Sequence, residues 1–388
     1  MDDVRLGLAG LGNRGCYGWL KCMKTVPGCK VVALCDPIGP RLQAGLNAAA
    51  DPEVKGFSDF GDMLTEADVD AVAIVVQPEN QPALILESLA AGKHTIGEVP
   101  LAYSLEDCWD IVTTVEKTGL TFAMGEQVSH APFVRAWKQM VDEGRLGKVL
   151  YAEGQYCHGR AAHRYWEDSR TGQRLTWEEA GDTPDAVKSR SWQMAHPIWY
   201  PPHDLAPILR ILDDHVVEVT CMGTRAPGYV LPDFPIADME VALMRLSKDT
   251  VYRQLNAFTA PTPQPWHWYH LMGTKGEVET ERAVDADGMW YLSDSHMTTR
   301  MPMRWEFTHH QPGIPGAAAS GHGGLDFYPI HDFIQCIQTG DTPVVDVYRA
   351  ANVSAAAAMA GLSVENGSQP MKVPDFRPSE ERRAGERP

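Results

Sequence analysis

Short apolar runs alternate with stretches of helical periodicity over the first 125 residues. The run at 70–76 (DAVAIVV) is continuously apolar, as expected for a strand covered on both faces of a parallel sheet. The pattern predicts strands at 4–9, 30–35, 70–76, 94–97 and 120–124 and helices at 15–25, 41–50, 81–91 and 104–118. Such strand–helix repetition predicts a parallel sheet with right-handed crossovers. Ser104 is the expected N-cap of the last helix, because Glu106 and Asp107 lie in its first turn.

The rhythm changes after residue 126. A helix at 132–142 and a strand at 148–158 precede a polar excursion over 160–190. Six further strands are predicted at 215–224, 237–247, 250–258, 266–281, 289–293 and 303–308. Strands in succession favour an antiparallel sheet. Helices at 327–339 and 347–366 follow, and the charged end of the chain is expected to fray.

Composition narrows the classes of function. The chain has 388 residues and a formal net charge of -17, which disfavours nucleic acid and anionic membranes as partners. Its eight cysteines are scattered without a C-x-x-C pair, so we expect reduced, mostly buried thiols. The sequence has no apolar stretch of the roughly 20 residues that span a membrane. Without a signal-like N-terminus the cytoplasm is the expected location, unless an export signal precedes this sequence.

A dinucleotide fingerprint follows the first strand. Gly10-Leu11-Gly12-Asn13-Arg14-Gly15 is a G-x-G-x-x-G between a strand and a helix, and Asp36 ends the next strand 21 residues after Gly15. Gly10 permits the tight turn, Gly12 lets the backbone approach a pyrophosphate, and Gly15 allows close packing of helix and strand. A glycine-rich turn without a ligand is the alternative interpretation. We expect an N-terminal Rossmann domain over 1–125 (α/β), a mostly antiparallel C-terminal sheet domain over 126–376 (α+β) for substrate and oligomerisation, and a tail over 377–388.

Asp36 also bears on the choice of nicotinamide cofactor. A carboxylate at this position accepts from the ribose 2′-hydroxyl and repels a 2′-phosphate, which favours NAD. Arg41 lies close enough in sequence to leave NADP open.

The turn at 92–100 (GKHTIGEVP) resembles the G-K-H-V-x-x-E-K-P segment of the Gfo/Idh/MocA family of sugar oxidoreductases. The resemblance implies that Glu98, Val99 and Pro100 lie beside the nicotinamide. It also implies that Gln77 contacts the cofactor, although its segment stands where the family has T-P-N and lacks the histidine that follows there. In the family a lysine at the position of Val99 assists proton transfer. Valine cannot do so, which weakens the interpretation as an ordinary dehydrogenase.

Three further segments are similar to the NAD-dependent glycosidase branch of that family, glycoside hydrolase family 109. They are 192–196 (WQMAH), 199–207 (WYPPHDLAP) and 321–327 (GHGGLDF), and 373–376 (VPDF) also fits. Pro202 stands where the branch has threonine and Asp204 where it has glycine, so subfamily and substrate stay open.

The resemblance implies three catalytic residues: His203, Tyr156 and Glu126, the last also beside the nicotinamide. It implies substrate contacts from Trp192, His196, Tyr200, His322 and Asp326. Each has a structural alternative: a loop hydrogen bond for His203, strand packing for Tyr156, and helix capping for Asp326. Tryptophans suited to sugar stacking are Trp192, Trp199, Trp266 and Trp268, although core packing is the more common role for any single one of them.

The function implied by the resemblance is redox-neutral glycoside cleavage. Transient oxidation at C3 acidifies the C2 proton, the C1 leaving group is eliminated, water adds, and C3 is reduced again. We assign His203 to proton transfer at the oxidised carbon and Tyr156 to C2, roles that could be exchanged. The alternatives are an ordinary NAD(P)-dependent sugar dehydrogenase or ketoreductase, and a non-catalytic sugar or nucleotide sensor.

A metal and a partner chain complete the expectations. Histidines 196, 203, 309, 310, 322 and 331 suggest a metal, but none of them form an i, i+4 pair and the reaction needs none, so no metal is expected. The resemblance implies a homo-oligomer, a dimer or tetramer, formed through the outer face of the C-terminal sheet.

Overall fold

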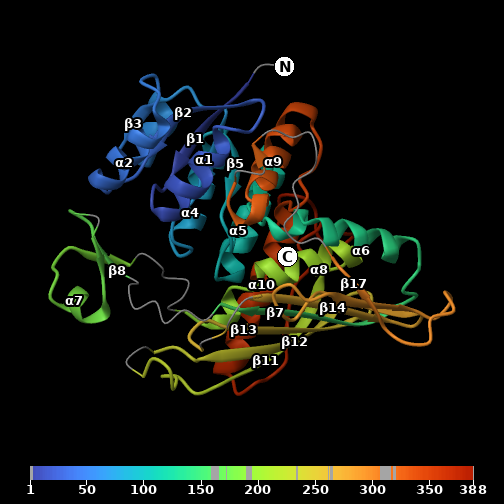
Figure 1. Cartoon of the computed structure of the whole chain (residues 1–388). Coiled ribbons are helices and arrows are strands. Elements are labelled where there is room, and N and C mark those ends of the chain that lie inside the picture. Colours follow the sequence, from blue (N-terminus) through green and yellow to red (C-terminus); the bar gives the residue numbers. More distant parts are fainter. Residues whose placement is uncertain are drawn as a thin grey trace.

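The computed structural model has two large sheets, which buried helices join, and a third sheet of three short strands (Figure 1). The described residues are 3–158, 166–171, 173–188, 195–232, 235–260, 262, 265–305, 316–317 and 320–387. Among these described parts of the chain, no helix is both long and apolar enough to cross a membrane.

The N-terminal sheet has six strands, all parallel, in the order β3-β2-β1-β4-β5-β6. The strands are β1 (Val4–Ala9), β2 (Cys29–Cys35), β3 (Lys55–Phe57), β4 (Ala71–Ile74), β5 (His94–Gly97) and β6 (Phe122–Met124). The helices that connect them are η1 (Arg14–Trp19) with α1 (Leu20–Met23), α2 (Gly39–Ala49), α3 (Phe60–Glu66), α4 (Gln81–Ala90) and α5 (Leu105–Thr118). All four residues of β4 are buried, which explains its continuous apolar run. This parallel sheet with its connecting helices confirms the α/β Rossmann fold expected for the N-terminal part of the chain.

Local signals set the ends of α5 as expected. The Ser104 hydroxyl accepts a hydrogen bond from the amide of Asp107, and Gly119 ends the helix in the left-handed region. The first helix differs from the prediction over 15–25, because η1 is a π-helix that passes into the single turn of α1.

The C-terminal sheet has nine strands in the order β17-β16-β15-β14-β7-β13-β12-β11-β18. The strands are β7 (Val149–Cys157), β11 (Val216–Gly223), β12 (Met239–Leu246), β13 (Val251–Ala257), β14 (His267–Gly273), β15 (Gly276–Glu279), β16 (Gly288–Leu292), β17 (Met301–Met303) and β18 (Met371–Lys372). Neighbours are antiparallel except β13 and β7, which are parallel, so the predicted mostly antiparallel sheet is confirmed.

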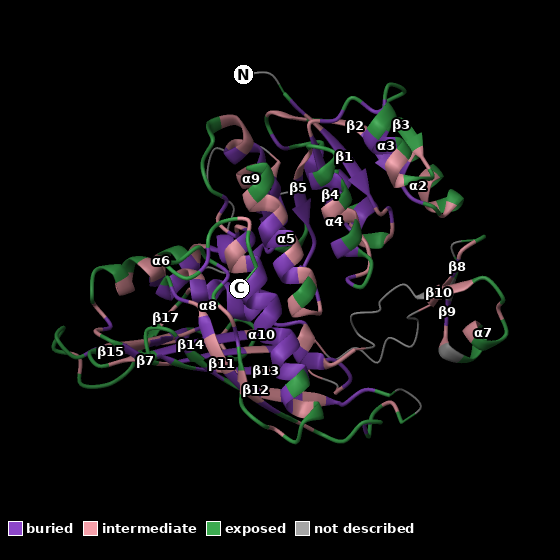
Figure 2. Cartoon of the chain, turned by 180° about the vertical axis from the view of Figure 1, so that it is seen from behind, coloured by how far each residue is buried: buried purple, intermediate pink, exposed green. Residues whose placement is uncertain are grey.

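Helices cover one face of this sheet. These are α6 (Pro132–Asp142), α8 (Pro202–Leu212) and α10 (Val347–Glu365), and Figure 2 shows α8 and α10 mostly buried. Helix α9 (Phe327–Thr339) crosses back and packs against β1, β5 and β6 of the N-terminal sheet. The C-terminal part of the chain therefore contributes a helix to the Rossmann domain. Asp326, the N-cap residue of α9, lies at this domain as a result.

Two strand predictions require correction. The single strand expected over 266–281 is two strands, β14 and β15, joined by a turn at 274–275. The strand expected over 303–308 is β17, which ends at Met303, and residues 306–308 lie outside the described part of the chain.

The polar excursion forms a small sheet of its own. Strands β8 (Trp166–Asp168), β9 (Arg174–Leu175) and β10 (Ala186–Lys188) pair antiparallel with β8 in the middle. Helix α7 (Trp177–Gly181) starts with a capping box between Thr176 and Glu179. Figures 1 and 2 both show this unit beside α2, apart from the large C-terminal sheet.

The expectation that the tail frays is wrong. Arg382 is only 5% exposed, forms an ion pair with Glu116 of α5 at 2.7 Å, and donates to the carbonyl of Phe376. The guanidinium also lies over the ring of Trp109. Charged composition suggested fraying, but these partners are distant in sequence and could not be read from it.

Candidate functional site

The glycine turn between β1 and η1 is shaped for a ligand. Gly10 has φ +92°, and a Cβ there would lie 2.2 Å from the carbonyl oxygen of Val75. A Cβ on Gly15 would lie 1.9 Å from the Gly10 carbonyl oxygen. A Cβ on Gly12 would meet no atom within 4 Å, so the turn is open at the residue that a pyrophosphate approaches. The first amides of η1 follow directly, which suits an anion.

Asp36 lies at the end of β2, next to this turn. It is 2% exposed, and its carboxylate accepts hydrogen bonds from the amides of Leu11 at 2.7 Å and Ile38 at 2.9 Å. Burial raises the pKa of Asp36, and the two amides oppose that shift. A carboxylate with remaining lone pairs beside the glycine turn can accept from ribose hydroxyls, so these residues fit a dinucleotide.

The turn after β5 is held by a residue that no motif indicated. The buried Gln81 amide donates to the carbonyls of Glu98 and Pro100, each at 2.8 Å, and accepts from the amide of Glu98 at 3.0 Å. Val99 is 4% exposed within this turn. Gln77 lies after β4, where its carbonyl accepts from the amide of Asn80.

An ionic network connects the glycine turn to the C-terminal part of the chain. Arg14 donates to Glu98 at 2.5 Å and to both carboxylate oxygens of Asp326, at 2.6 and 3.0 Å. Glu98 also accepts from the indole of Trp19 at 2.7 Å. Although burial opposes the effect, the Arg14 guanidinium and His322 lower the pKa of Asp326 well below its ordinary value.

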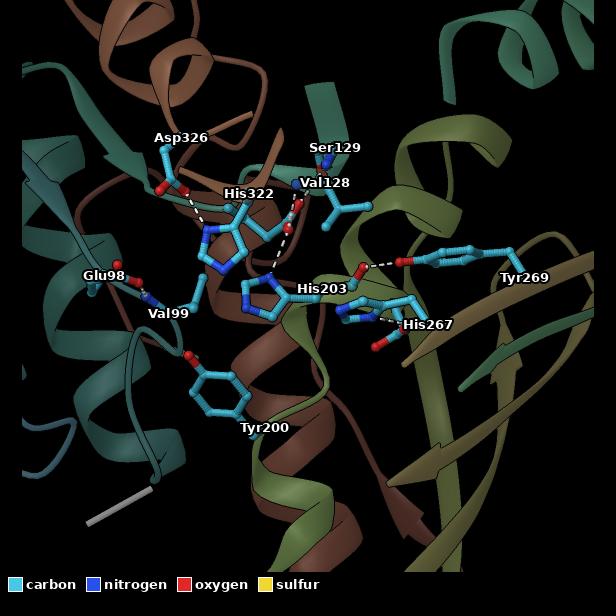
Figure 3. Close-up of polar contacts among 12 residues, drawn as sticks. Glu98, Val99, Val128, Ser129, Tyr200, His203, His267, Tyr269, His322 and Asp326 are labelled. Carbon is cyan, nitrogen blue, oxygen red and sulfur yellow. Dashed lines mark hydrogen bonds and ion pairs between the residues drawn. The ribbon is translucent and has the colours of Figure 1, made fainter. Parts of the chain in front are cut away.

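His322 extends this network towards the domain junction. Its Nδ1 lies 2.8 Å from Asp326, and Figure 3 shows its ring between Asp326 and His203. His322, Gly323 and Gly324 have φ of 50°, 65° and 97°, so a non-glycine residue occupies the left-handed region here. Such strain collects at functional sites.

The centre of the cluster is a buried carboxylate–imidazole pair. Glu126 is fully buried and accepts hydrogen bonds from the amides of Val128 at 2.8 Å and Ser129 at 2.7 Å. His203, in the first turn of α8, lies with Nδ1 3.0 Å from Glu126 (Figure 3). Because a carboxylate only accepts, Nδ1 carries a proton towards Glu126, and Nε2 is the ring nitrogen that remains for a substrate. The hydroxyl of Tyr269 donates to the carbonyl of His203 at 2.7 Å and fixes the backbone.

Aromatic side chains surround His203. The ring centroids of Tyr156 on β7 and of Tyr200 each lie 5.6 Å from that of His203. Burial, with the nearby Glu98 charge, raises the pKa of Tyr200 well above its ordinary value, so this hydroxyl is a donor and not a phenolate. The ring centroids of Tyr156 and Tyr200 are 6.2 Å apart, so both rings flank the imidazole of His203.

A second histidine–carboxylate pair lies behind Tyr156, and sequence reasoning missed it. The imidazole of His267 stacks on Tyr156 with centroids 4.3 Å apart and an interplanar angle of 15°. Its Nδ1 lies 3.1 Å from the fully buried Asp204. Asp204 was noticed only as a departure from a glycine, and His267 sits in an ordinary strand pattern without a motif.

The structure brings most of the predicted residues together, but not all. His196 bonds Glu240 at 2.7 Å and Glu365 at 3.3 Å, away from the residues around His203, and the Glu240 hydrogen bond raises its pKa. Trp268 lies on the outer face of the sheet beneath the Arg282 guanidinium. Trp192 falls outside the described residues.

The described side chains do not form a metal site. Within the described ranges, no group of three or more histidine, cysteine, aspartate or glutamate side chains could hold a metal ion. Histidines 309 and 310 lie outside those ranges. All eight cysteines are free, and only Cys29 is not fully buried.

Comparison with known families adds an independent result. Residues 4–126 match the model of the oxidoreductase family with an NAD-binding Rossmann fold. Residues 244–381 match the model of the glycosyl hydrolase 109 C-terminal domain.

Related sequences align with nearly the whole chain. A glycosyl hydrolase family 109 protein of Porphyromonas gingivalis is 27% identical over 419 residues, covering 97% of this chain and 85% of the relative. One from Saccharopolyspora erythraea is also 27% identical and covers 97% and 83%.

Solved structures share the fold. An oxidoreductase domain protein from Kribbella flavida aligns with a TM-score of 0.76 at 17% identity, covering 96% of this chain and all of the other. Scyllo-inositol dehydrogenase from Lactobacillus casei with bound NAD(H) and scyllo-inositol aligns with a TM-score of 0.67 at 16% identity, covering 96% and 99%. At this identity the likeness concerns the fold alone.

Proposed function

We propose that the chain is an NAD-dependent, redox-neutral glycosidase, because residues 4–126 match the Gfo/Idh/MocA oxidoreductase family and residues 244–381 match the glycosyl hydrolase 109 C-terminal domain. The observation that carries the proposal is the buried Glu126–His203 pair beside the Val99 turn. It offers an oriented base where the resembled oxidoreductases use a lysine. The ionisable groups around it are those that a proton relay on a sugar requires.

The glycine turn and Asp36 are the residues that would hold the cofactor. When bound, NAD supplies a reversible oxidation of a sugar hydroxyl, here the one at C3. The Glu98–Pro100 turn would lie beside the reacting carbon, with its backbone fixed by Gln81.

His203 is proposed to exchange the proton of the C3 hydroxyl. Glu126 holds the imidazole in the tautomer whose Nε2 can accept, and it stabilises the imidazolium once the proton has moved. Tyr269 and the Glu126 amide contacts keep this pair in place while substrate enters. The proton returns to the C3 oxygen when the carbonyl is reduced at the end of the cycle.

Tyr156 is proposed to move the C2 proton. A C3 ketone acidifies that proton by delocalising the resulting charge into an enolate, and the C1 leaving group then departs with its bonding pair. Water adds to C1 of the enone, and C2 takes a proton back. In this proposal the His267 ring, which stacks on Tyr156, positions the phenol. The hydroxyl of Tyr200, whose ring lies 6.2 Å from that of Tyr156, donates to the enolate.

An ordinary sugar dehydrogenase is the second candidate. The likeness to NAD(H)-bound inositol dehydrogenases favours it at the level of fold. It would have to use His203 in place of the missing lysine and release a reduced cofactor after each turnover.

The proposal extends to the setting of the enzyme. Its substrate is a small carbohydrate, and the eight free cysteines support a reducing, cytoplasmic location. Leu243, Val251 and Met272 are 48%, 39% and 40% exposed on the face of the sheet away from the helices. These apolar side chains support a homo-oligomer through that face, which analytical ultracentrifugation would detect.

The test is hydrolysis of aryl glycosides in deuterated water without added cofactor. The proposal predicts aglycone release, deuterium at C2 of the sugar and no accumulation of NADH. Stoichiometric NADH would instead identify a dehydrogenase. Hydrolysis with no deuterium at C2 would contradict the elimination step.

A matched pair of variants assigns the base. His203→Ala should abolish turnover and spare NAD binding. His296→Ala, at an exposed histidine of the C-terminal domain, should leave both unchanged. Normal turnover by His203→Ala would refute the assignment.

A further inference from the structure

Arg41 is the residue whose positive charge leaves NADP open as an alternative to NAD. It lies in the first turn of α2, five residues after Asp36. Although burial lowers it, the hydrogen bond and charge of Glu167, and then the charge of Asp36, raise the pKa of Arg41. Burial raises the pKa of Asp36 and the Arg41 charge opposes that shift, so the two side chains interact. A free guanidinium here would be placed to bind a ribose 2′-phosphate.

That guanidinium is already bound by another carboxylate. Arg41 donates through Nε to Glu167 at 2.8 Å, and the two side chains are only 18% and 13% exposed. Glu167 comes from the small sheet of the excursion, 126 residues further along the chain. It is the middle residue of the central strand β8, paired with Val187 on one side and the backbone of Arg174 on the other. Figures 1 and 2 show this unit beside α2 of the Rossmann domain.

The resulting group of charges suits a hydroxyl and not a phosphate. Asp36 and Glu167 together place two carboxylates around one guanidinium, so the group has a net negative charge. A 2′-phosphate adds about 1.5 to 2 further negative charges. It could recruit Arg41 only by breaking a largely buried ion pair and leaving Glu167 unpaired.

We propose that Glu167 is a specificity-determining residue that selects NAD over NADP by sequestering Arg41 beside Asp36. A small sheet that follows the Rossmann domain in the chain thereby sets which dinucleotide that domain accepts. This inference rests on NAD binding by the Rossmann domain, and not on the sugar chemistry.

The test measures dissociation constants for NAD and NADP by isothermal titration calorimetry on the full chain. Glu167→Gln removes one negative charge and frees Arg41, so the preference for NAD over NADP should fall on the order of tenfold or more. The gain should appear as tighter NADP binding with little change for NAD. Glu178→Gln, at an exposed carboxylate of α7 in the same unit, is the matched control and should change neither constant.

A second variant tests the part played by Arg41. In Arg41→Ala/Glu167→Gln the phosphate has lost its cation, so the gain in NADP affinity should be largely absent. An unchanged ratio in Glu167→Gln, or an equal gain in both backgrounds, would overturn the inference. If wild-type protein binds neither dinucleotide, the proposed function fails first, and the two failures are therefore distinguishable.

Discussion

Glu126→Gln removes the charge at the centre of the cluster and keeps its volume. The carboxylate accepts three hydrogen bonds, from the amides of Val128 and Ser129 and from His203. A glutamine amide presents only one oxygen, so in either orientation its NH₂ group faces a buried backbone N–H. That N–H loses its acceptor, which costs about 1–3 kcal/mol of folding free energy.

The larger effect is on the tautomer of His203. If the glutamine NH₂ faces the imidazole, it can donate to Nδ1 and leave the proton on Nε2, the nitrogen that should accept from substrate. Loss of an orienting carboxylate in a comparable histidine-based site lowers kcat about 10⁴-fold. We therefore expect kcat to fall by about 10³- to 10⁴-fold with NAD affinity within a few-fold of wild type.

The assay combines steady-state kinetics on an aryl glycoside, NAD titration and urea unfolding. Glu66→Gln, at an exposed carboxylate that ends α3, controls for charge removal in general. If Glu126→Gln is destabilised by about 2 kcal/mol and yet keeps more than a tenth of wild-type turnover, the pair is structural and the reasoning is refuted.

Three other predictions follow from the same contacts. Gly12→Ala should keep wild-type stability, because its Cβ meets no atom within 4 Å, but it should weaken NAD binding about tenfold or more. Gly15→Ala should lower the melting temperature, because its Cβ would lie 1.9 Å from a carbonyl oxygen. The pKa of Asp326 is lowered in the folded state, so its carboxylate stabilises the fold at pH values above the ordinary pKa of 3.8, and this stabilisation is lost as the pH falls below that value. In urea unfolding, Asp326→Asn should therefore lose less free energy of unfolding on acidification than wild type. Arg382→Ala should cost about 3 kcal/mol in urea unfolding, because Glu116, with a side chain only 3% exposed, loses its cation and keeps only the hydrogen bonds from Tyr348 and Gly385. An effect under about 0.5 kcal/mol would show that the C-terminal segment is not anchored there.

Features with a local signal could be predicted from the sequence. The Ser104 cap, the glycine turn and Asp36 at the end of the second strand depend on neighbours within a few residues, or on strand–helix order. The two-sheet architecture followed from the change in apolar periodicity near residue 126.

Features that depend on distant partners could not be predicted. Asp204 and His267 are 63 residues apart, and Arg14 and Asp326 are 312 apart, so neither pairing has a sequence signal. The same reason explains the wrong expectation for the tail, whose Arg382 pairs with a residue 266 positions earlier. His196 was drawn into the predicted site by a motif, whereas its contacts are with Glu240 and Glu365.

Stopped-flow absorbance of the nicotinamide during a single turnover tests the central claim most directly. With enzyme that holds NAD in excess of the glycoside, the account predicts a transient signal of the reduced cofactor that rises and then returns to its starting level as aglycone is released. A signal that rises and persists, or aglycone release with no signal and no dependence on NAD, would contradict it.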